Sequence, residues 1–217
     1  IIISKRIASE TYKDEVVEIR SLVEEGKTEA AANKKKQLLA FTPSGVFKEK
    51  RLLPNLERYT QFLHLDFDKL TLEQLQDAFQ VISNIPYTFL CFVSPSGNGL
   101  KVFIEVNTGV EHHETAYLQV QKYYEDATGL KADPNCKDIT RLCFMSYDPM
   151  LYKNLNYQKF KVEIQVLENN IKNIKEVKPI LNIQKQHQEE QSEDLNAAFI
   201  FNQQIQFTNL KSNYNHG

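Results

Sequence analysis

The sequence predicts an α+β fold built around a β-α-β-β-α-β unit of the ferredoxin-like or RNA-recognition-motif-like type. Apolar runs at residues 62–67, 87–93 and 100–106 have the length of strands. A glycine-rich turn separates the second run from the third, which indicates a hairpin. Amphipathic stretches follow the first run and the third run. Two helices would then cover one face of an antiparallel sheet and leave the other face open.

The first strand, at residues 62–67, alternates in character along its length. Side chains of a strand point to opposite faces in turn, so two sets are expected. One set would face the helices and the other the open side: Leu63, Leu65 and Phe67 in the first, and His64, Asp66 and Asp68 in the second.

The remaining elements follow in order. Thr71 and Gln74 form a capping box that predicts a helix start, with an apolar stripe through Leu72, Leu75, Phe79 and Ile82. A second amphipathic helix is expected at about residues 111–126, with Gly129 just beyond its end. The last strand of the unit is expected at about residues 139–146, on the free side of strand 62–67.

The composition and length of the chain indicate that the β-α-β-β-α-β unit is one part of it. The 217 residues include 41% apolar and 25% charged side chains, enough for one substantial core. We expect accessory helices at residues 1–37, the core domain at 38–165, a polar linker at 166–195, and the start of a truncated helical domain at 196–217.

Partner class and compartment are also constrained by the sequence. A net charge of −2 excludes a global basic footprint, so nucleic acid would have to bind through local patches. No run of about 18 apolar residues and no signal peptide are present, which predicts a cytoplasmic protein with no membrane partner. Cys91, Cys136 and Cys143 show no metal-ligand spacing and are expected to be reduced thiols.

Two acids end the first strand on one face. Asp66 and Asp68 are two residues apart, about 7 Å along a strand. Like charges at this spacing repel unless a cation lies between them, and carboxylate oxygens suit Mg²⁺ or Mn²⁺. The two acids therefore predict a divalent-cation site, with a solvated acidic turn as the alternative.

The hairpin turn supplies a second candidate group. Ser96, Gly97 and Gly99 form a small turn that leads into a strand whose second residue is Lys101. Backbone amides in such a turn can bind phosphate oxygens, with the lysine adding charge. A plain hairpin turn with a surface lysine is the alternative. The expected sheet places Lys101 beside the acids of the first strand.

The segment entering the last strand supplies a third group. It carries Asp133, Asp138 and Arg141, which could bring another carboxylate and a guanidinium to the same face. A surface turn and an Asp138–Arg141 ion pair form the alternative. Together the three groups predict a two-metal site that acts on a nucleoside triphosphate.

These motifs resemble those of the archaeo-eukaryotic primase superfamily. The set consists of residues 65–68, 94–101 and 133–149, within a resemblance that covers about residues 38–155. The VirE-associated N-terminal domain, found ahead of helicase domains on mobile elements and phages of Bacteroides-type bacteria, is especially similar. The resemblance implies metal ligands at Asp66 and Asp68 and a third acid at Asp133 or, alternatively, Asp138. It also implies that Lys101 stands where the superfamily has a nucleotide-contacting histidine.

The resemblance implies a function that can be tested. We expect a primase or primase-polymerase that joins nucleoside triphosphates (NTP or dNTP) on single-stranded DNA, with two Mg²⁺ or Mn²⁺ ions and a helicase domain in the same or a neighbouring protein. The alternative is a catalytically degenerate primase fold that acts as a DNA-binding or helicase-associated module.

Overall fold

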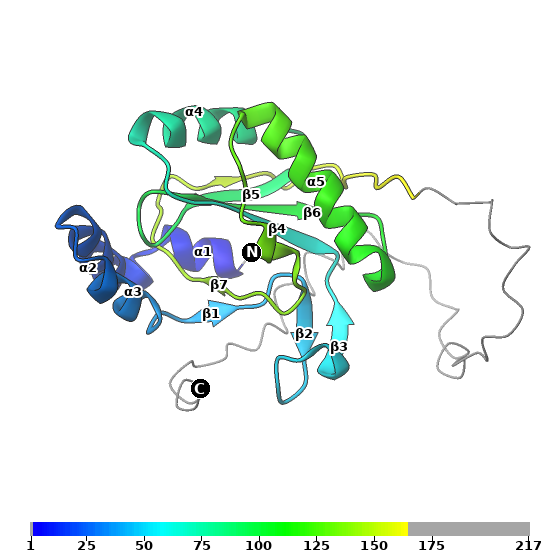
Figure 1. Ribbon diagram of the computed structural model, residues 1–217, viewed down its shortest axis with the longest axis horizontal. Helices are drawn as coiled ribbons and strands as arrows, with labels where there is room; N and C mark the ends of the chain where they lie inside the picture. Colours follow the sequence, from blue (N-terminus) through cyan, green and yellow to red (C-terminus); the bar gives the residue numbers. More distant parts are fainter. Residues whose placement is uncertain (1, 165–217) are drawn as a thin grey trace, which may run out of the picture.

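The computed structural model describes residues 2–164. The expected linker at 166–195 and the expected helical domain at 196–217 lie outside the described residues. Three helices come first, and the strands and the two remaining helices follow (Figure 1). The order is α1 (Ile2–Ala8), α2 (Lys13–Glu24), α3 (Thr28–Lys35), β1 (Ala40–Phe41), β2 (Gly45–Phe47), β3 (Leu56–Tyr59), β4 (Phe62–Phe67), α4 (Leu72–Ser83), β5 (Thr88–Val93), β6 (Leu100–Glu105), α5 (His113–Thr128), β7 (Cys143–Phe144) and β8 (Tyr152–Lys153). The α+β class is confirmed.

The central sheet is antiparallel, with the strand order β4-β6-β5-β8. The expected hairpin of β5 and β6 forms, and β6 is the neighbour of β4, as the sequence predicted. Helices α4 and α5 lie over one face of this sheet (Figure 1). Leu63, Leu65 and Phe67 point into that layer, where they form one core with Ile82 of α4 and Tyr117 of α5.

The other face of the sheet is not open, so that prediction is wrong. Ile3 and Ile7 of α1 and Phe41 of β1 pack on it together with aromatic side chains of the sheet, namely Phe62, Phe89, Phe92 and Phe103. These aromatic side chains are almost completely buried. A face with so many large apolar groups must be covered, because exposing them to water is unfavourable. The N-terminal segment supplies this cover.

The expected last strand at residues 139–146 is also wrong in its extent and its partner. Only Cys143–Phe144 is extended, and it pairs antiparallel with β1 in a separate two-stranded sheet. Beside β4 the chain makes a single backbone bond, from Asp133 N to Asp66 O at 2.8 Å. Pro134 then begins a short 3-10 helix, which turns the chain away from the sheet. The strand order of an RNA-recognition motif is therefore not formed.

Helix α4 begins as the sequence predicted. Thr71 Oγ1 accepts a hydrogen bond from Gln74 N at 3.2 Å, and Gln74 Oε1 accepts one from Thr71 N at 3.0 Å. Leu75 and Phe79 pack against the core, but Leu72 is 72% exposed, so its place in the buried stripe was wrong. It occupies the first helical position, where the capping turn directs its side chain to solvent.

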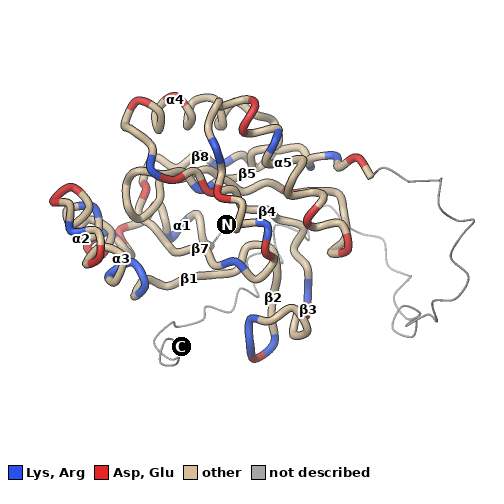
Figure 2. Tube along the Cα trace, viewed as in Figure 1, with Lys and Arg blue, Asp and Glu red and all other residues tan. Residues whose placement is uncertain are grey.

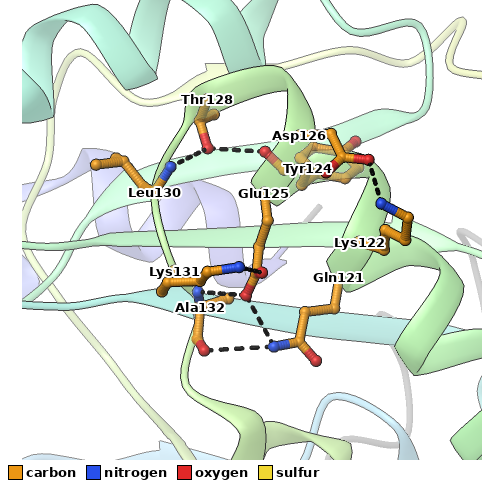
Figure 3. A network of polar contacts seen from close by, with 9 residues as sticks. All are labelled: Gln121, Lys122, Tyr124, Glu125, Asp126, Thr128, Leu130, Lys131 and Ala132. Atoms are coloured by element: carbon orange, nitrogen blue, oxygen red, sulfur yellow. Dashed lines mark hydrogen bonds and ion pairs between the residues drawn. The ribbon is translucent and has the colours of Figure 1, made fainter.

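A polar network fixes the loop that leaves α5 (Figure 3). Gly129 ends the helix in a left-handed conformation at φ 70°. Glu125 Oε1 accepts hydrogen bonds from Ala132 N at 3.0 Å and from Gln121 Nε2 at 2.9 Å, while Oε2 pairs with Lys131 Nζ at 2.6 Å. The network holds Ala132 in place and so directs the next residue, Asp133, to the edge of β4.

Candidate active site

The centre of the candidate site is a buried ion pair between two neighbouring strands. Asp66 of β4 lies opposite Lys101 of β6 in the sheet register, so both side chains emerge on the same face. Lys101 Nζ forms an ion pair with Asp66 Oδ2. Each residue is only 5% exposed. The lysine that the sequence placed beside the acids therefore lies in direct contact with the first of them.

The protonation of Lys101 and of Asp68 follows from their surroundings. Burial opposes the charged form of Lys101, but Asp66 and Asp68 outweigh that effect and raise its pKa. Desolvation raises the pKa of Asp68; Lys101 opposes this rise, and the adjacent Asp66 carboxylate adds to it. Asp68 is nevertheless an exposed residue, at the end of the strand. Lys101 is therefore a fixed positive charge, and Asp68 binds its proton more tightly than an isolated aspartate does.

The segment that carries Asp133, Asp138 and Arg141 brings one of its two acids to the edge of β4, beside Asp66. Asp133 is anchored to β4 through its backbone N–H, and its Oδ2 pairs with Arg141 Nη2 at 2.8 Å. Asp133 Oδ1 accepts bonds from the backbone and side chain of Asn135. Asp138 is exposed, and its carboxylate caps Thr140 instead. Arg141 therefore pairs with Asp133, and not with Asp138 as the alternative had it.

The glycine turn lies against the end of β4. A Cβ on Gly99 would lie 2.5 Å from Phe67 O and 2.9 Å from Asp68 Oδ1, so only glycine allows this approach. Gly97 has φ 80°, and its N–H donates to Ser94 O at 3.0 Å. Ser96 is half-buried within the same turn. The turn thus positions the acids of β4, while phosphate binding by its backbone stays a prediction.

Two basic residues near the site come from helices that the sequence analysis treated as accessory. Lys35 of α3 lies close to the cluster: burial and Lys101 lower its pKa, while Asp68 and Asp66 oppose this. Arg20 of α2 lies under the glycine turn and donates from Nη2 to Ser94 O at 3.3 Å and to Tyr147 O at 2.9 Å. No local pattern in these polar helices indicated either contact.

Free ligand atoms decide which residues can hold a metal. Asp66 Oδ1 is buried and has no hydrogen-bond partner among residues 2–164. Asp68 adjoins it, as the effect of Asp66 on its pKa shows. These two acids offer the oxygen ligands that a divalent ion such as Mg²⁺ takes. Both oxygens of Asp133 are already engaged, so the arrangement suits one ion without rearrangement and a second only if Arg141 moves.

A comparison with models of known protein families shows which family the chain belongs to. The family model described as the BT4734-like, N-terminal domain matches residues 33–152, which is more than half of the sequence. The chain belongs to this family. It is a Bacteroides family, in agreement with the expected Bacteroides-type domain. The matched part of the BT4734-like domain includes the acids and cations of the candidate site, while α1 and α2 precede it.

The chain was also compared with curated proteins and with solved structures. No curated protein and no solved structure matches the chain. Within the described part of the BT4734-like protein, no helix combines the length and the apolar character that a membrane span requires. Cys91, Cys136 and Cys143 are free thiols, and all three are buried.

Proposed function

We propose that this BT4734-like domain is a primase-type nucleotidyltransferase module that extends nucleotides on single-stranded DNA. One observation carries the proposal: three separate segments meet around Asp66. Strand β4 brings Asp66 and Asp68, the Asp133 segment binds the same strand through its backbone, and Lys101 and Arg141 pair with two of the acids. Acids for a cation beside cations for phosphate are the groups that phosphoryl transfer requires.

The proposed metal ligands are Asp66, through its unpartnered Oδ1, and Asp68. Asp133 would join them only after release from Arg141. A divalent ion bound there, Mg²⁺ or Mn²⁺, would lower the pKa of an attacking hydroxyl and stabilise charge on the transferred phosphate. The arrangement of these acids therefore supports one ion directly and the two-metal site only with a rearrangement.

Nucleotide binding would use the cations of the cluster. Lys101 and Arg141 are paired internally in the free domain, so an incoming triphosphate would have to exchange partners with Asp66 and Asp133. That exchange would free both acids for metal at the moment the substrate binds. Lys35 adds a third positive charge beside the acids. The turn at Ser96, Gly97 and Gly99 is the proposed neighbour of the phosphates.

A basic loop next to the site supports DNA as the template. Lys and Arg gather in the loop between β2 and β3 (Figure 2), which contains Lys48, Lys50 and Arg51. Arg51 Nη1 donates a hydrogen bond to Thr140 O, so this loop adjoins the Asp133–Arg141 segment. Basic side chains bind the phosphate backbone without reading sequence. A helicase domain remains the proposed neighbour in the replication protein.

The internal ion pairs favour a second candidate function. Asp66 is neutralised by Lys101 and Asp133 by Arg141, which weakens the attraction of the site for metal ions. A domain of this kind could have lost catalysis and kept DNA binding. It would then act as a DNA-binding or helicase-associated module of the same fold.

A primer-synthesis assay separates the two functions. The full chain is incubated with single-stranded DNA, labelled NTP or dNTP, and Mg²⁺ or Mn²⁺, beside the variant Asp68→Asn. We expect incorporation by the wild type and its loss in the variant. Asp126→Asn is the matched control, because that exposed acid lies on α5 and pairs with Lys122.

The catalytic proposal is rejected if the wild type incorporates no nucleotide with either metal on any template. Anisotropy with labelled single-stranded DNA then tests the second candidate. Under that candidate the wild type binds DNA, and Asp68→Asn binds it equally or more tightly, because a negative charge near the phosphates is removed.

A further inference from the structure

Three buried side chains of different chemistry meet at the edge of β4. His64 and Asp66 point from the strand, and Cys136 comes from the 3-10 helix at Pro134–Lys137. One ligand atom from each lies within 4.8 Å of the others. The three residues are 2%, 5% and 2% exposed, in that order. The sequence placed His64 on the same strand face as Asp66 and predicted a reduced thiol at Cys136.

Two atoms of this cluster lack hydrogen-bond partners within the described chain. They are His64 Nε2 and Asp66 Oδ1, and both are inaccessible to solvent. Polar atoms buried in this way are rare in native proteins, because each has given up its hydrogen bonds to water. Two residues that each carry such an atom, with ligand atoms within 4.8 Å of each other and of a thiol sulfur, indicate that a ligand satisfies both.

The donor set identifies the class of ligand. One nitrogen, one carboxylate oxygen and one sulfur are donors that Zn²⁺ accepts, whereas Mg²⁺ takes oxygen. Metal–ligand bonds of about 2.0 to 2.3 Å in a tetrahedron place the ligand atoms about 3.3 to 3.7 Å apart. The observed limit of 4.8 Å exceeds that spacing by about 1 Å, a change that side-chain rotations can provide.

We propose that His64, Asp66 and Cys136 bind a transition-metal ion of the Zn²⁺ class, with a fourth position open to another ligand. The ion takes the imidazole nitrogen, the carboxylate oxygen and the thiolate sulfur, and the thiol proton leaves to solvent. Lys101 holds only Oδ2 of Asp66, which leaves Oδ1 for the metal. The new thiolate and the nearby Asp68 carboxylate offset the added positive charge, while Asp133 stays paired with Arg141.

The site has a consequence that rests on the proposed function. Asp66 Oδ1 is also the oxygen proposed for Mg²⁺ or Mn²⁺, and an oxygen that is bound to Zn²⁺ cannot complete the Asp68 site at the same time. A Zn²⁺ ion bound by His64 and Cys136 therefore competes with the catalytic ion, and low concentrations of Zn²⁺ would inhibit nucleotide incorporation.

Cobalt titration of the chelator-treated full chain tests the site without any activity measurement. Tetrahedral Co²⁺ gives visible d–d bands, and a thiolate ligand adds a charge-transfer band in the near ultraviolet. We expect both bands at one ion per chain and their removal by added Zn²⁺. Cys136→Ser should lose the charge-transfer band and bind at least about tenfold more weakly. Cys91→Ser is the matched control, because Cys91 is an equally buried thiol of β5 that lies outside the cluster.

Absence of the bands in the wild type overturns the site, and so does a charge-transfer band that persists in Cys136→Ser. His64→Gln should also weaken binding, and equal affinity there overturns the ligand assignment. Circular dichroism checks that the variants fold. If Cys136→Ser does not fold, the site is tested on the wild type. The rate at which Cys136 is alkylated after brief partial unfolding should be lower with bound Zn²⁺ than without it, and an unchanged rate overturns the site.

The two proposals fail separately. Asp68→Asn should keep the cobalt spectrum while losing incorporation, and Cys136→Ser should keep Mg²⁺-dependent incorporation while losing inhibition by Zn²⁺. A normal cobalt spectrum without incorporation by the wild type rejects the primase proposal alone. Incorporation without a cobalt spectrum rejects the zinc-class site alone.

Discussion

Replacing Lys101 with methionine tests whether the internal ion pair determines the properties of the site. Methionine keeps most of the length and apolar volume of the lysine stem, so the packing of β6 is largely preserved. The change removes only the positive charge. Asp66, which is 5% exposed, would then be a buried carboxylate without its counter-ion, and Asp68 would stand beside it with the same charge.

The magnitude follows from the burial of the pair. Removing one partner of a buried ion pair typically costs about 3 to 5 kcal/mol, because the remaining charge has lost its compensation. At 94% and 93% burial of their side chains, Lys101 and Asp66 belong to that class. The double variant Asp66→Asn with Lys101→Met removes both charges and should recover at least half of the loss.

The loss should also depend on pH. Desolvation raises the pKa of Asp68 and Lys101 lowers it, so removing Lys101 should raise the pKa of Asp68 further above its unfolded value, and the native state should bind that proton more tightly than the unfolded state does. The stability of Lys101→Met should therefore fall as the pH rises from about 4 to 8, relative to the wild type. At low pH a protonated Asp68 no longer repels the Asp66 carboxylate, which relieves part of the penalty.

Urea unfolding followed by circular dichroism measures these differences. Lys122→Met is the control, since Lys122 and Asp126 form an ion pair whose side chains are 76% and 65% exposed. Exposed pairs contribute less than about 1 kcal/mol. The reasoning is refuted if Lys101→Met loses no more stability than this control, or if the double variant is no more stable than Lys101→Met.

Further predictions concern the strand end, the helix cap and the thiols. Gly99→Ala should destabilise the fold by about 1 to 3 kcal/mol in urea unfolding, because its Cβ would meet Phe67 O at 2.5 Å; wild-type stability would show that the turn can shift freely. Asp68→Asn should gain stability relative to the wild type as the pH rises above about 4, since the raised pKa of Asp68 makes its ionised form unfavourable in the native state; parallel pH profiles would contradict this. Thr71→Ala should cost about 1 kcal/mol through loss of the capping box, and an unchanged urea midpoint would contradict it. Burial raises the pKa of Cys136 and of Cys143 to about 12, so native protein at pH 8 should resist iodoacetamide until it is unfolded, as mass spectrometry would show; rapid alkylation of the native protein would contradict it.

Local signals in the sequence predicted the sheet core and the placement of its acids. Alternation in residues 62–67, the capping box at Thr71 and the glycine-rich turn are each determined by neighbours in the chain, and each has its expected structure. Asp66 and Lys101 lie close together because they are opposite each other in the register of β4 and β6. Their direct ion pair was not predicted, because nothing in the sequence showed that both would be buried.

The errors came from interactions between distant segments. Residues 139–146 have the composition of a strand, but Pro134 turns the chain, and the extended part pairs with β1, about a hundred residues earlier. Likewise, the helices at residues 1–37 are mostly polar, and only a few apolar positions, such as Ile3 and Ile7, show how they cover the sheet. The aromatic positions on both faces of the sheet were the one available signal that a cover was needed.

The covered face limits how a nucleic acid can bind. Modules of the RNA-recognition type stack bases on aromatic side chains of an open sheet. Here Phe62, Phe92 and Phe103 are at most 1% exposed beneath α1 and β1, so the sheet face of the described domain cannot serve as a stacking platform. Of the acids on β4, only Asp68 at the strand end is exposed. Under the proposed function, substrates would therefore reach the cluster from the end of β4 where Asp68 is exposed. The basic loop after β2 adjoins the Asp133–Arg141 segment through Arg51, so under the proposed function a DNA strand would lie on this loop while its end approaches Asp68.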